Sequence, residues 1–400
     1  MKRHFKAWLK RYGRPAWHWL LRALLPSSTL VGVSSPRRIL LMNGGHIGDV
    51  VIATSLLPVL RSAFPKVEIG FLTASWSHAV VRNHPEVAHT HRVDHWRMNR
   101  NAMGWIRKRL RYWRTRRQAL REIRALSYDI SLSLHPWRAD FLPLAWQAAI
   151  PVRAAFISGL WSPLATVLAE YPDDDLPIHQ GECQARLLTQ IGIESSHMRG
   201  RRSSLAPTSD QMLSEVRDVL GLSGLGRLRY DVIHMGAGVQ AKELPLSFWR
   251  ELASRVAIDR AVLFTGRGER ESANVDRVID GLPGCHNACD KLSWDGFVAA
   301  IRHAEVLYSV DSMASHVAAA VGTKCIAMYG GMHTIARWRP DGGNCVVWSN
   351  AVACSPCHHQ NGCALMSCMR GFVPATIADS ARDDLLSAPA NKLMQCSISA

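Results

Sequence analysis

The sequence predicts an α/β protein built from two doubly wound parallel sheets, and three observations point to this fold class. The chain has 400 residues, which favours two domains of ordinary size over one. Short apolar runs alternate along it with longer segments of helical pattern. Small or polar residues follow each apolar run before the next helix begins, as they do where helices join parallel strands.

The strands are predicted from short runs rich in apolar side chains. We expect them at 39–42, 67–73 and 130–134 in the first half, and at 231–235, 261–265, 306–310 and 324–329 in the second. Proline and glycine residues make 206–228 the expected linker. The two domains then cover 37–205 and 229–373, with a helix and tail at 374–400.

The composition of the chain limits the binding partners that we expect for it. The chain is 48% hydrophobic and 20% charged, as expected for a globular protein with real cores. Its net charge of +16 favours anionic partners, namely nucleic acid, a membrane surface or a phosphorylated substrate. Ten cysteines without secretory context indicate a reducing compartment. We find no run of about 18 apolar residues, the length that a spanning helix needs.

Residues 1–36 form a basic amphipathic extension. Its cationic residues are interleaved with tryptophan and leucine, a composition typical of a helix lying in a membrane interface. The cations are Lys2, Arg3, Lys6, Lys10, Arg11, Arg14 and Arg22. We therefore expect contact with a membrane surface, with a targeting peptide or a solvated extension as the alternatives.

A second basic island spans residues 96–124, where eleven lysines and arginines accompany Trp96, Trp105, Tyr112 and Trp113. Like charges this dense repel one another unless an anion lies among them. Single-stranded nucleic acid and a phosphorylated glycolipid are both suitable anions, and composition does not separate them.

The first candidate for chemistry is Asp49. It stands at the start of a helix, after a predicted strand and a turn that holds Gly44, Gly45 and Gly48. A turn of this kind leaves space beside the carboxyl end of the strand, where open parallel sheets bind their ligands.

Three further turns follow strands of the second half. Gly236-Ala237-Gly238 with Lys242 offers backbone amides and a countercharge for a phosphate, although a tight turn with a surface lysine explains it equally well. Gly266 followed by Glu269 or Glu271 is typical of a ribose contact, and equally of an ordinary acidic helix start.

The third of these turns holds Asp311 and Ser312, which precede a helix of small residues. The amides at the start of that helix and the Ser312 hydroxyl are candidate phosphate ligands, and an N-cap is the structural alternative. His316 lies one turn further on, where it either orients a ligand or packs.

Four motifs together resemble glycosyltransferase family nine, the lipopolysaccharide heptosyltransferases and their relatives. They are Ile-Gly-Asp-Val at 47–50, Gly-Ala-Gly with a later lysine and proline at 236–245, Thr-Gly with Gly-Glu-Arg at 265–270, and Asp-Ser with a histidine and alanines at 311–319. The resemblance covers about residues 37–373. It implies a GT-B fold, in which two Rossmann-like domains face each other across a cleft, and inverting transfer that needs no metal.

The resemblance also implies roles. Asp49 matches the general base that takes the proton of the acceptor hydroxyl, and Lys242 matches the lysine that stabilises the departing diphosphate. The implied donor-binding residues are Gly236, Ala237, Gly238, Gly266, Glu269, Asp311, Ser312 and His316. For the acceptor we expect contacts from Gly45, His46, Arg107, Arg109 and Arg111. The implied donor is a nucleotide sugar, usually ADP-heptose.

Two positions depart from the family pattern. Met313 stands where relatives usually have glycine after the Asp-Ser pair, and Asn-Gly-Gly-His precedes Ile47 where they commonly carry an arginine and small residues. These departures leave the donor and the acceptor contacts open. The Asp-x-Asp spacing at 173–175, which metal-dependent glycosyltransferases use, lies between prolines and is interpreted as a solvated loop.

Four cysteines fall within fifteen residues near the end of the chain: Cys354, Cys357, Cys363 and Cys368. This spacing predicts a structural zinc site, with buried thiols or a disulfide as the alternatives.

Together the residues predict an inverting, metal-independent glycosyltransferase that moves a sugar, heptose by resemblance, to an anionic lipopolysaccharide-type glycolipid. We expect it in the cytoplasm, peripheral on the inner face of the cytoplasmic membrane. Two alternatives stay open: a non-catalytic GT-B relative that binds a nucleotide sugar, and a nucleic-acid-binding protein with a four-cysteine metal module.

Overall fold

The structure is a computed structural model that describes residues 35–135, 141–157, 161–173, 176–221, 229–350 and 352–382, and the backbone of 393–396. The basic extension predicted at 1–36 lies almost wholly outside these residues, as do Asp174 and Asp175. The chain divides into two compact units. Unit 1 takes in 1–172 and 181–201, and unit 2 takes in 173–180 and 202–400.

Unit 1 is built on a parallel sheet of six strands in the order β3-β2-β1-β4-β5-β6. The strands are β1 (Arg38–Met42), β2 (Glu68–Thr73), β3 (His89–Arg92), β4 (Ile130–Ser133), β5 (Val152–Phe156) and β6 (Val167–Ala169). In β1, Ile39 pairs with Ile69 of β2 and with Ile130 of β4. Because β1 has a partner on both sides and helices on both faces, all four residues from Ile39 to Met42 are buried.

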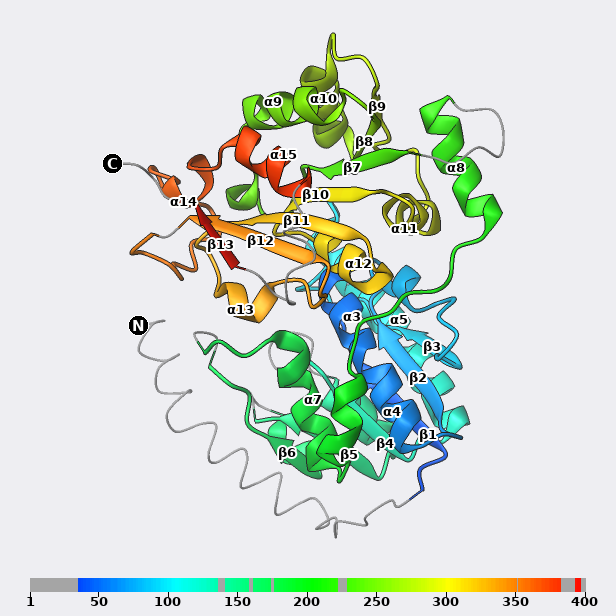
Figure 1. Cartoon of the computed structure of the whole chain (residues 1–400). Coiled ribbons are helices and arrows are strands. Elements are labelled where there is room, and N and C mark those ends of the chain that lie inside the picture. Colours follow the sequence, from blue (N-terminus) through cyan, green and yellow to red (C-terminus); the bar gives the residue numbers. More distant parts are fainter. Residues whose placement is uncertain are drawn as a thin grey trace. The chain divides into compact units, whose positions relative to one another are not determined.

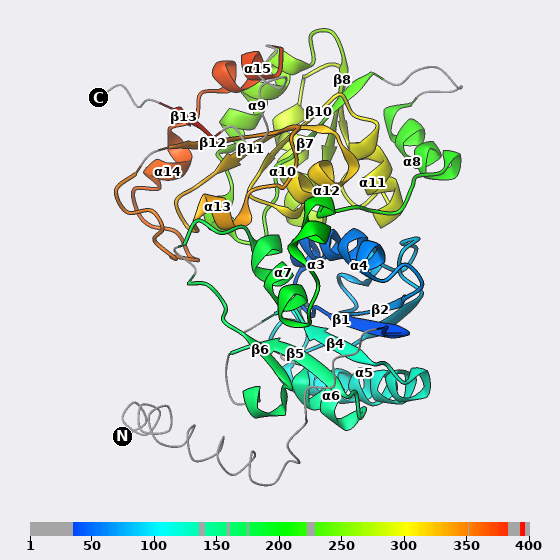
Figure 2. The same ribbon diagram turned by 60° about the horizontal axis from the view of Figure 1, so that its bottom comes forward.

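Helices cover both faces of this sheet. On one face lie α3 (Ile47–Ala53), η2 (Thr54–Leu56) and α4 (Leu57–Ala63), and on the other α5 (Trp105–Leu126) and α6 (Leu142–Gln147) (Figure 2). Alternate residues of β1 lie on the second face of the sheet, where Leu40 and Met42 pack against Ala119 and Ile123 of α5. The remaining elements are η3 (His78–Val80), η4 (Ser162–Leu164), α7 (Gln180–Gln190) and η5 (Ser195–Gly200).

Unit 2 is built on a parallel sheet of seven strands in the order β13-β12-β11-β10-β7-β8-β9 (Figure 1). The strands are β7 (Tyr230–His234), β8 (Ala261–Thr265), β9 (Cys285–Asn287), β10 (Val306–Val310), β11 (Lys324–Tyr329), β12 (Cys345–Asn350) and β13 (Leu393–Cys396). Every strand predicted in either half is present, with ends that differ by no more than one residue.

The helices of unit 2 also form two layers. Helices α9 (Leu246–Val256), α10 (Glu269–Ile279) and α15 (Pro374–Arg382) pack together on one face, and α8 (Asp210–Leu220), α11 (Trp294–Arg302) and α12 (Met313–Val321) on the other (Figure 1). The short elements are η6 (Gln240–Lys242), α13 (Ile335–Trp338) and α14 (Ser367–Arg370).

The segment predicted as a linker contains α8. This helix is fixed to the start of α11, because the Glu215 carboxylate accepts hydrogen bonds from Ser293 N at 2.7 Å and Ser293 Oγ at 2.8 Å. Within the described residues, no helix is both long and apolar enough to cross a membrane.

The strand order reverses once in each unit. In unit 1 the chain leaves β1 toward β2 and later returns to β4 on the other side, and in unit 2 it leaves β7 toward β8 and returns to β10. Open parallel sheets bind ligands at such switch points, at the carboxyl ends of the strands. The loops that follow β1, β4, β7 and β10 are therefore where a site is expected.

Candidate active site

The loop after β1 is folded around the carboxylate of Asp49. Oδ2 of Asp49 accepts a hydrogen bond from the backbone N–H of His46 at 2.8 Å, and Asn43 Oδ1 accepts one from Gly45 N at 2.9 Å. A Cβ atom at Gly45 would lie 2.7 Å from Asp49 Oδ2. Glycine is thus required at position 45 because the Asp49 side chain turns back against the loop.

Further ionisable groups surround Asp49. Asp49 interacts electrostatically with Arg100 and with His46. His46 also interacts with the charges of Arg100 and His135. Burial is the largest cause that lowers the pKa of His46, and the charges of Arg100 and His135 lower it further. His135 follows β4, so residues from both sides of the switch point meet here. Sequence reasoning singled out Asp49 and His46 but not His135, and counted Arg100 only as part of the basic island.

The three arginines expected to meet the acceptor lie on α5, and the structure gives them different environments. Arg111 donates from Nε to Asp94, a completely buried carboxylate. Arg109 lies over the rings of Trp96 and Trp105, 5.0 and 5.6 Å from their centroids. Arg107 is exposed. None of the three is recorded in contact with Asp49 within the described residues.

In unit 2, the predicted donor-binding residues gather at one edge of the sheet. The turn at Gly236 follows β7, Gly266 follows β8, and Asp311 and Ser312 follow β10. Because β7 lies between β8 and β10, these carboxyl ends are neighbours. The grouping that sequence order alone only suggested is therefore present in this unit.

The clearest link between two of these loops is an ion pair. Lys242 Nζ lies 2.6 Å from Asp311 Oδ2, and their side chains are 16% and 12% exposed. The pair joins the loop after β7 to the loop after β10 across the switch point. A lysine ammonium has three N–H donors, so two remain for other acceptors at this position.

Glu271 is the acidic residue that touches the glycine turns. A Cβ atom at Gly236 would lie 2.6 Å from its carboxylate, and one at Gly266 would lie 2.8 Å from its Oε2. Glu271 also accepts a hydrogen bond from Arg267 N at 2.9 Å, and burial raises its pKa. Glu269, the residue of this pair expected in the site, is exposed at the first position of α10.

Ser312 serves as the N-cap of α12. Its backbone is extended and its Oγ accepts a hydrogen bond from Ala314 N at 3.3 Å, which is the structural alternative considered for this residue. His316 is buried one turn into the helix. Met313 is the first residue of α12 and is not among the residues with positive φ, so its side chain causes no backbone strain. Ala237 is half-buried and Gly238 exposed.

The four clustered cysteines lie in different environments. Cys354 and Cys363 are exposed, and Cys363 Sγ accepts a hydrogen bond from Met366 N. Cys368 instead packs against the apolar core of unit 2. Among the described residues, no three or more histidine, cysteine, aspartate or glutamate side chains are arranged to hold a metal ion. The structure gives the zinc site no support, and it stays a prediction from spacing.

The last residue of β7, His234, gives the stability of unit 2 a dependence on pH. Its Nδ1 lies 3.0 Å from Thr265 Oγ1, and burial lowers the pKa of His234 to about 4. The unfolded chain binds a proton near pH 6.5, so the stability contribution is complete above that pH and is lost as the pH falls toward 4. Between pH 7.5 and pH 5 the loss amounts to about 2 kcal/mol.

His234→Gln should flatten this dependence, because glutamine does not titrate. The expected result is a thermal unfolding midpoint that falls less than the wild-type midpoint, by several degrees, when the pH drops from 7.5 to 5. The same change at the exposed His359 is the matched control and should leave the wild-type profile unchanged. Equal slopes for wild type and His234→Gln would show that this histidine is not buried in its neutral form.

Comparison with known proteins agrees with this arrangement. The family model described as glycosyltransferase family 9 (heptosyltransferase) matches residues 202–366. Lipopolysaccharide heptosyltransferase 3 of Escherichia coli is 24% identical over 319 residues, which are 76% of this chain and 84% of that protein.

Two solved structures extend the comparison over both units. The glycosyl transferase family 9 protein from Veillonella parvula has a TM-score of 0.65 at 19% identity, over 78% of this chain and 86% of its own. ADP-heptose LPS heptosyltransferase II of E. coli has a TM-score of 0.67 at 17% identity, over 88% and 98%.

A doubly wound parallel sheet in each unit, with candidate ligand loops at both switch points, is the fold that the chain shares with these solved structures. The match of residues 202–366 to the glycosyltransferase family 9 model agrees with the family resemblance drawn from the sequence. The fold class, the family resemblance and the enzyme class, a glycosyltransferase, predicted from the sequence are thereby confirmed.

Proposed function

We propose that this enzyme is a heptosyltransferase of lipopolysaccharide synthesis that moves heptose from ADP-heptose to an anionic glycolipid acceptor, with inversion and without a metal. The observation that carries the proposal is the Lys242–Asp311 pair, because it holds a cation at the switch point of unit 2. The names of the E. coli relatives support the sugar and the nucleotide.

The proposed chemistry uses one carboxylate and one ammonium. Asp49 takes the proton of the acceptor hydroxyl as that oxygen bonds to the anomeric carbon from the face opposite the diphosphate. The bond from the anomeric carbon to the diphosphate oxygen breaks, and ADP leaves with the electron pair. Lys242 stabilises the charge that grows on the departing diphosphate.

The surroundings of both residues support these roles. The hydrogen bond from His46 N holds Asp49 Oδ2, so the second carboxylate oxygen is the one proposed to receive the proton. The charge of Asp49 in turn favours the charged form of the neighbouring Arg100. The glycines 236, 238 and 266 with Ala237, Ser312 and His316 are proposed to line the donor site. Glu271 is proposed in place of Glu269 for the ribose hydroxyls, because it lies against the glycine turns.

Nucleotide selectivity tests the donor. In a thermal-shift panel of ADP, UDP, GDP and CDP, ADP is expected to give the largest stabilisation, about 2.7 kcal/mol when its concentration is 100 times its dissociation constant. If another nucleotide stabilises the protein most, the fold assignment stands and the proposed donor is wrong. If none of the four stabilises the protein, the non-catalytic and nucleic-acid alternatives gain support, and an oligonucleotide titration at two salt concentrations would separate them.

A further inference from the structure

The outward face of α5 carries an unusual concentration of exposed apolar side chains. The described residues include ten exposed large hydrophobic side chains, and four of them fall within the first nine residues of this helix. They are Trp105 (66% exposed), Ile106 (56%), Leu110 (64%) and Trp113 (52%). Ile106, Leu110 and Trp113 follow one another at spacings of four and three residues, so they lie on one face of the helix.

Exposed arginines surround these side chains. Arg107, Arg109, Arg114, Arg117 and Arg121 are exposed, and none of them belongs to an ion pair recorded between described residues. The single acidic residue of α5 is Glu122, which faces the sheet side, where His91 Nδ1 lies 3.0 Å from its Oε2. The outward face is therefore both apolar and strongly positive.

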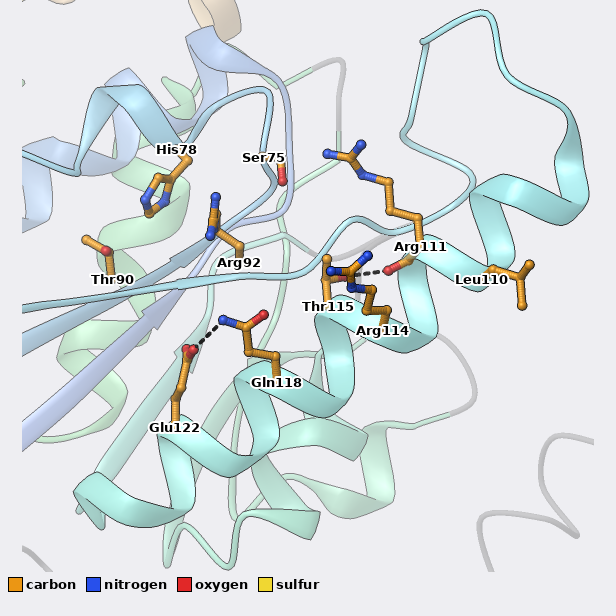
Figure 3. A pocket seen from close by; sticks show the side chains of 10 residues that line it. All are labelled: Ser75, His78, Thr90, Arg92, Leu110, Arg111, Arg114, Thr115, Gln118 and Glu122. Atoms are coloured by element: carbon orange, nitrogen blue, oxygen red, sulfur yellow. Dashed lines mark hydrogen bonds between the residues drawn. The ribbon is translucent and has the colours of Figure 1, made fainter.

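A basic hollow adjoins this face. Between β3 and α5 a cavity of about 580 Å³ is lined by Arg92, Arg111 and Arg114 together with His78 and Ser75, and Glu122 is the one acidic residue among the described residues in its lining. Figure 3 shows Arg92, from the strand, and Arg111 and Arg114, from the helix, around the same space. Leu110 and Arg114 border both this hollow and a shallow second depression that Trp113, Arg117 and Arg121 complete on the outward face.

Charge decides what can cover such a surface. The N-terminal extension of this chain carries seven lysines and arginines in its first 22 residues, so it would be repelled. A second copy would place the same arginines against one another in a two-fold contact. Nucleic acid would satisfy the arginines but would leave Ile106 and Leu110 in water, because aliphatic side chains offer no plane for a base to stack on.

We propose that the outward face of α5 is a docking surface for an anionic lipid bilayer. A helix with tryptophan, isoleucine and leucine among arginines lies in the interface with its apolar side chains in the acyl boundary and its cations at the lipid phosphates. The neighbouring hollow adds positive charge where headgroups would lie. The surface lies on the helix that also carries Arg107, Arg109 and Arg111, which were expected to contact the acceptor, and the proposal holds whichever sugar is transferred.

Vesicle co-sedimentation of the full chain tests the surface, since it does not depend on transfer activity. Wild-type protein is expected to bind vesicles of phosphatidylcholine with phosphatidylglycerol, to bind pure phosphatidylcholine weakly, and to be released as salt is raised. The triple variant Ile106→Ser, Leu110→Ser, Trp113→Ser should lose at least about tenfold in affinity. Arg114→Gln, Arg117→Gln, Arg121→Gln should lose a similar factor through the electrostatic attraction.

Matched controls remove the same number of apolar groups or charges elsewhere. Ile258→Ser, Leu365→Ser, Val373→Ser changes three exposed apolar side chains of unit 2, and Arg199→Gln, Arg202→Gln, Arg277→Gln changes three exposed arginines outside α5. Both controls should bind vesicles as the wild type does, and unfolding midpoints should confirm that all four variants are folded.

Three outcomes would overturn the proposal. Wild-type binding by both folded α5 variants would assign membrane contact to the N-terminal extension instead. If the arginine control loses the same factor in vesicle affinity, binding depends on the net charge of the protein and not on α5. If the apolar variant instead abolishes a dimer in size-exclusion chromatography, or if both α5 variants weaken RNA binding and spare vesicle binding, another partner covers the face.

Discussion

Asp49→Asn is expected to lower turnover by at least about 10²-fold while ADP binds as tightly as to the wild type. The asparagine side chain keeps the shape of the aspartate and one acceptor oxygen, so the hydrogen bond from His46 N can persist. What it lacks is the ability to take a proton from the acceptor hydroxyl. Single-turnover transfer from ADP-heptose would give the rate, and an ADP thermal shift would report the donor site.

Asp210→Asn provides a matched control for this change, because Asp210 is likewise an acidic residue in the first turn of a helix, in unit 2. It should leave turnover at the wild-type level. Full turnover by Asp49→Asn would remove Asp49 from the proton transfer. An inactive wild type that still binds ADP would instead favour a non-catalytic relative, and would leave the proposed membrane surface untouched.

The fold could be predicted from the sequence because its buried strands are continuous apolar runs. The strand expected at 231–235 is β7 at 230–234, and those at 261–265 and 306–310 have the expected ends. Two of the strands that were not predicted, β3 and β6, lack that signal. β3 reads His-Thr-His-Arg because it pairs only with β2 at the edge of the sheet, and the edge strand β6 has three residues.

The candidate site was less predictable, because its contacts join loops that are distant in the sequence. His135 and Arg100 reach the loop of Asp49 from segments far along the chain, and neither has a motif of its own. Which of Glu269 and Glu271 lies against the glycine turns depends on the residue at which α10 begins. A sequence pattern rarely determines a helix start to one residue. The ion pair between Lys242 and Asp311 depends on β7 and β10 being neighbours, which strand order alone decides.

The two units share one packing feature at their switch points. At each switch point an acidic side chain lies against a glycine: Asp49 against Gly45 in unit 1, and Glu271 against Gly236 in unit 2. In each case the close approach brings a carboxylate to the carboxyl end of a central strand. The glycines at these positions are thus explained by packing within the loop, before any ligand is considered.

Lys242→Ala is expected to weaken ADP binding by about 10- to 100-fold, because it removes charge-assisted hydrogen bonds proposed to reach the diphosphate. An ADP titration followed by thermal shift measures the loss. The control is Lys324→Ala, which removes an exposed lysine at the opposite, amino-terminal end of the same sheet and should change nothing. Unaltered ADP affinity in Lys242→Ala would take this lysine out of the donor site.

Asp311→Asn then separates two roles for the ion pair. If Asp311 only orients an ammonium that binds phosphate, removing its negative charge leaves ADP affinity equal to or higher than that of the wild type, since one repulsive carboxylate near the diphosphate is gone. If the pair mainly fastens the two loops together, Asp311→Asn and Lys242→Ala lose ADP affinity by the same factor, and the double variant loses no more than either alone. We expect the first pattern, because two of the three ammonium donors of Lys242 remain available beside Asp311.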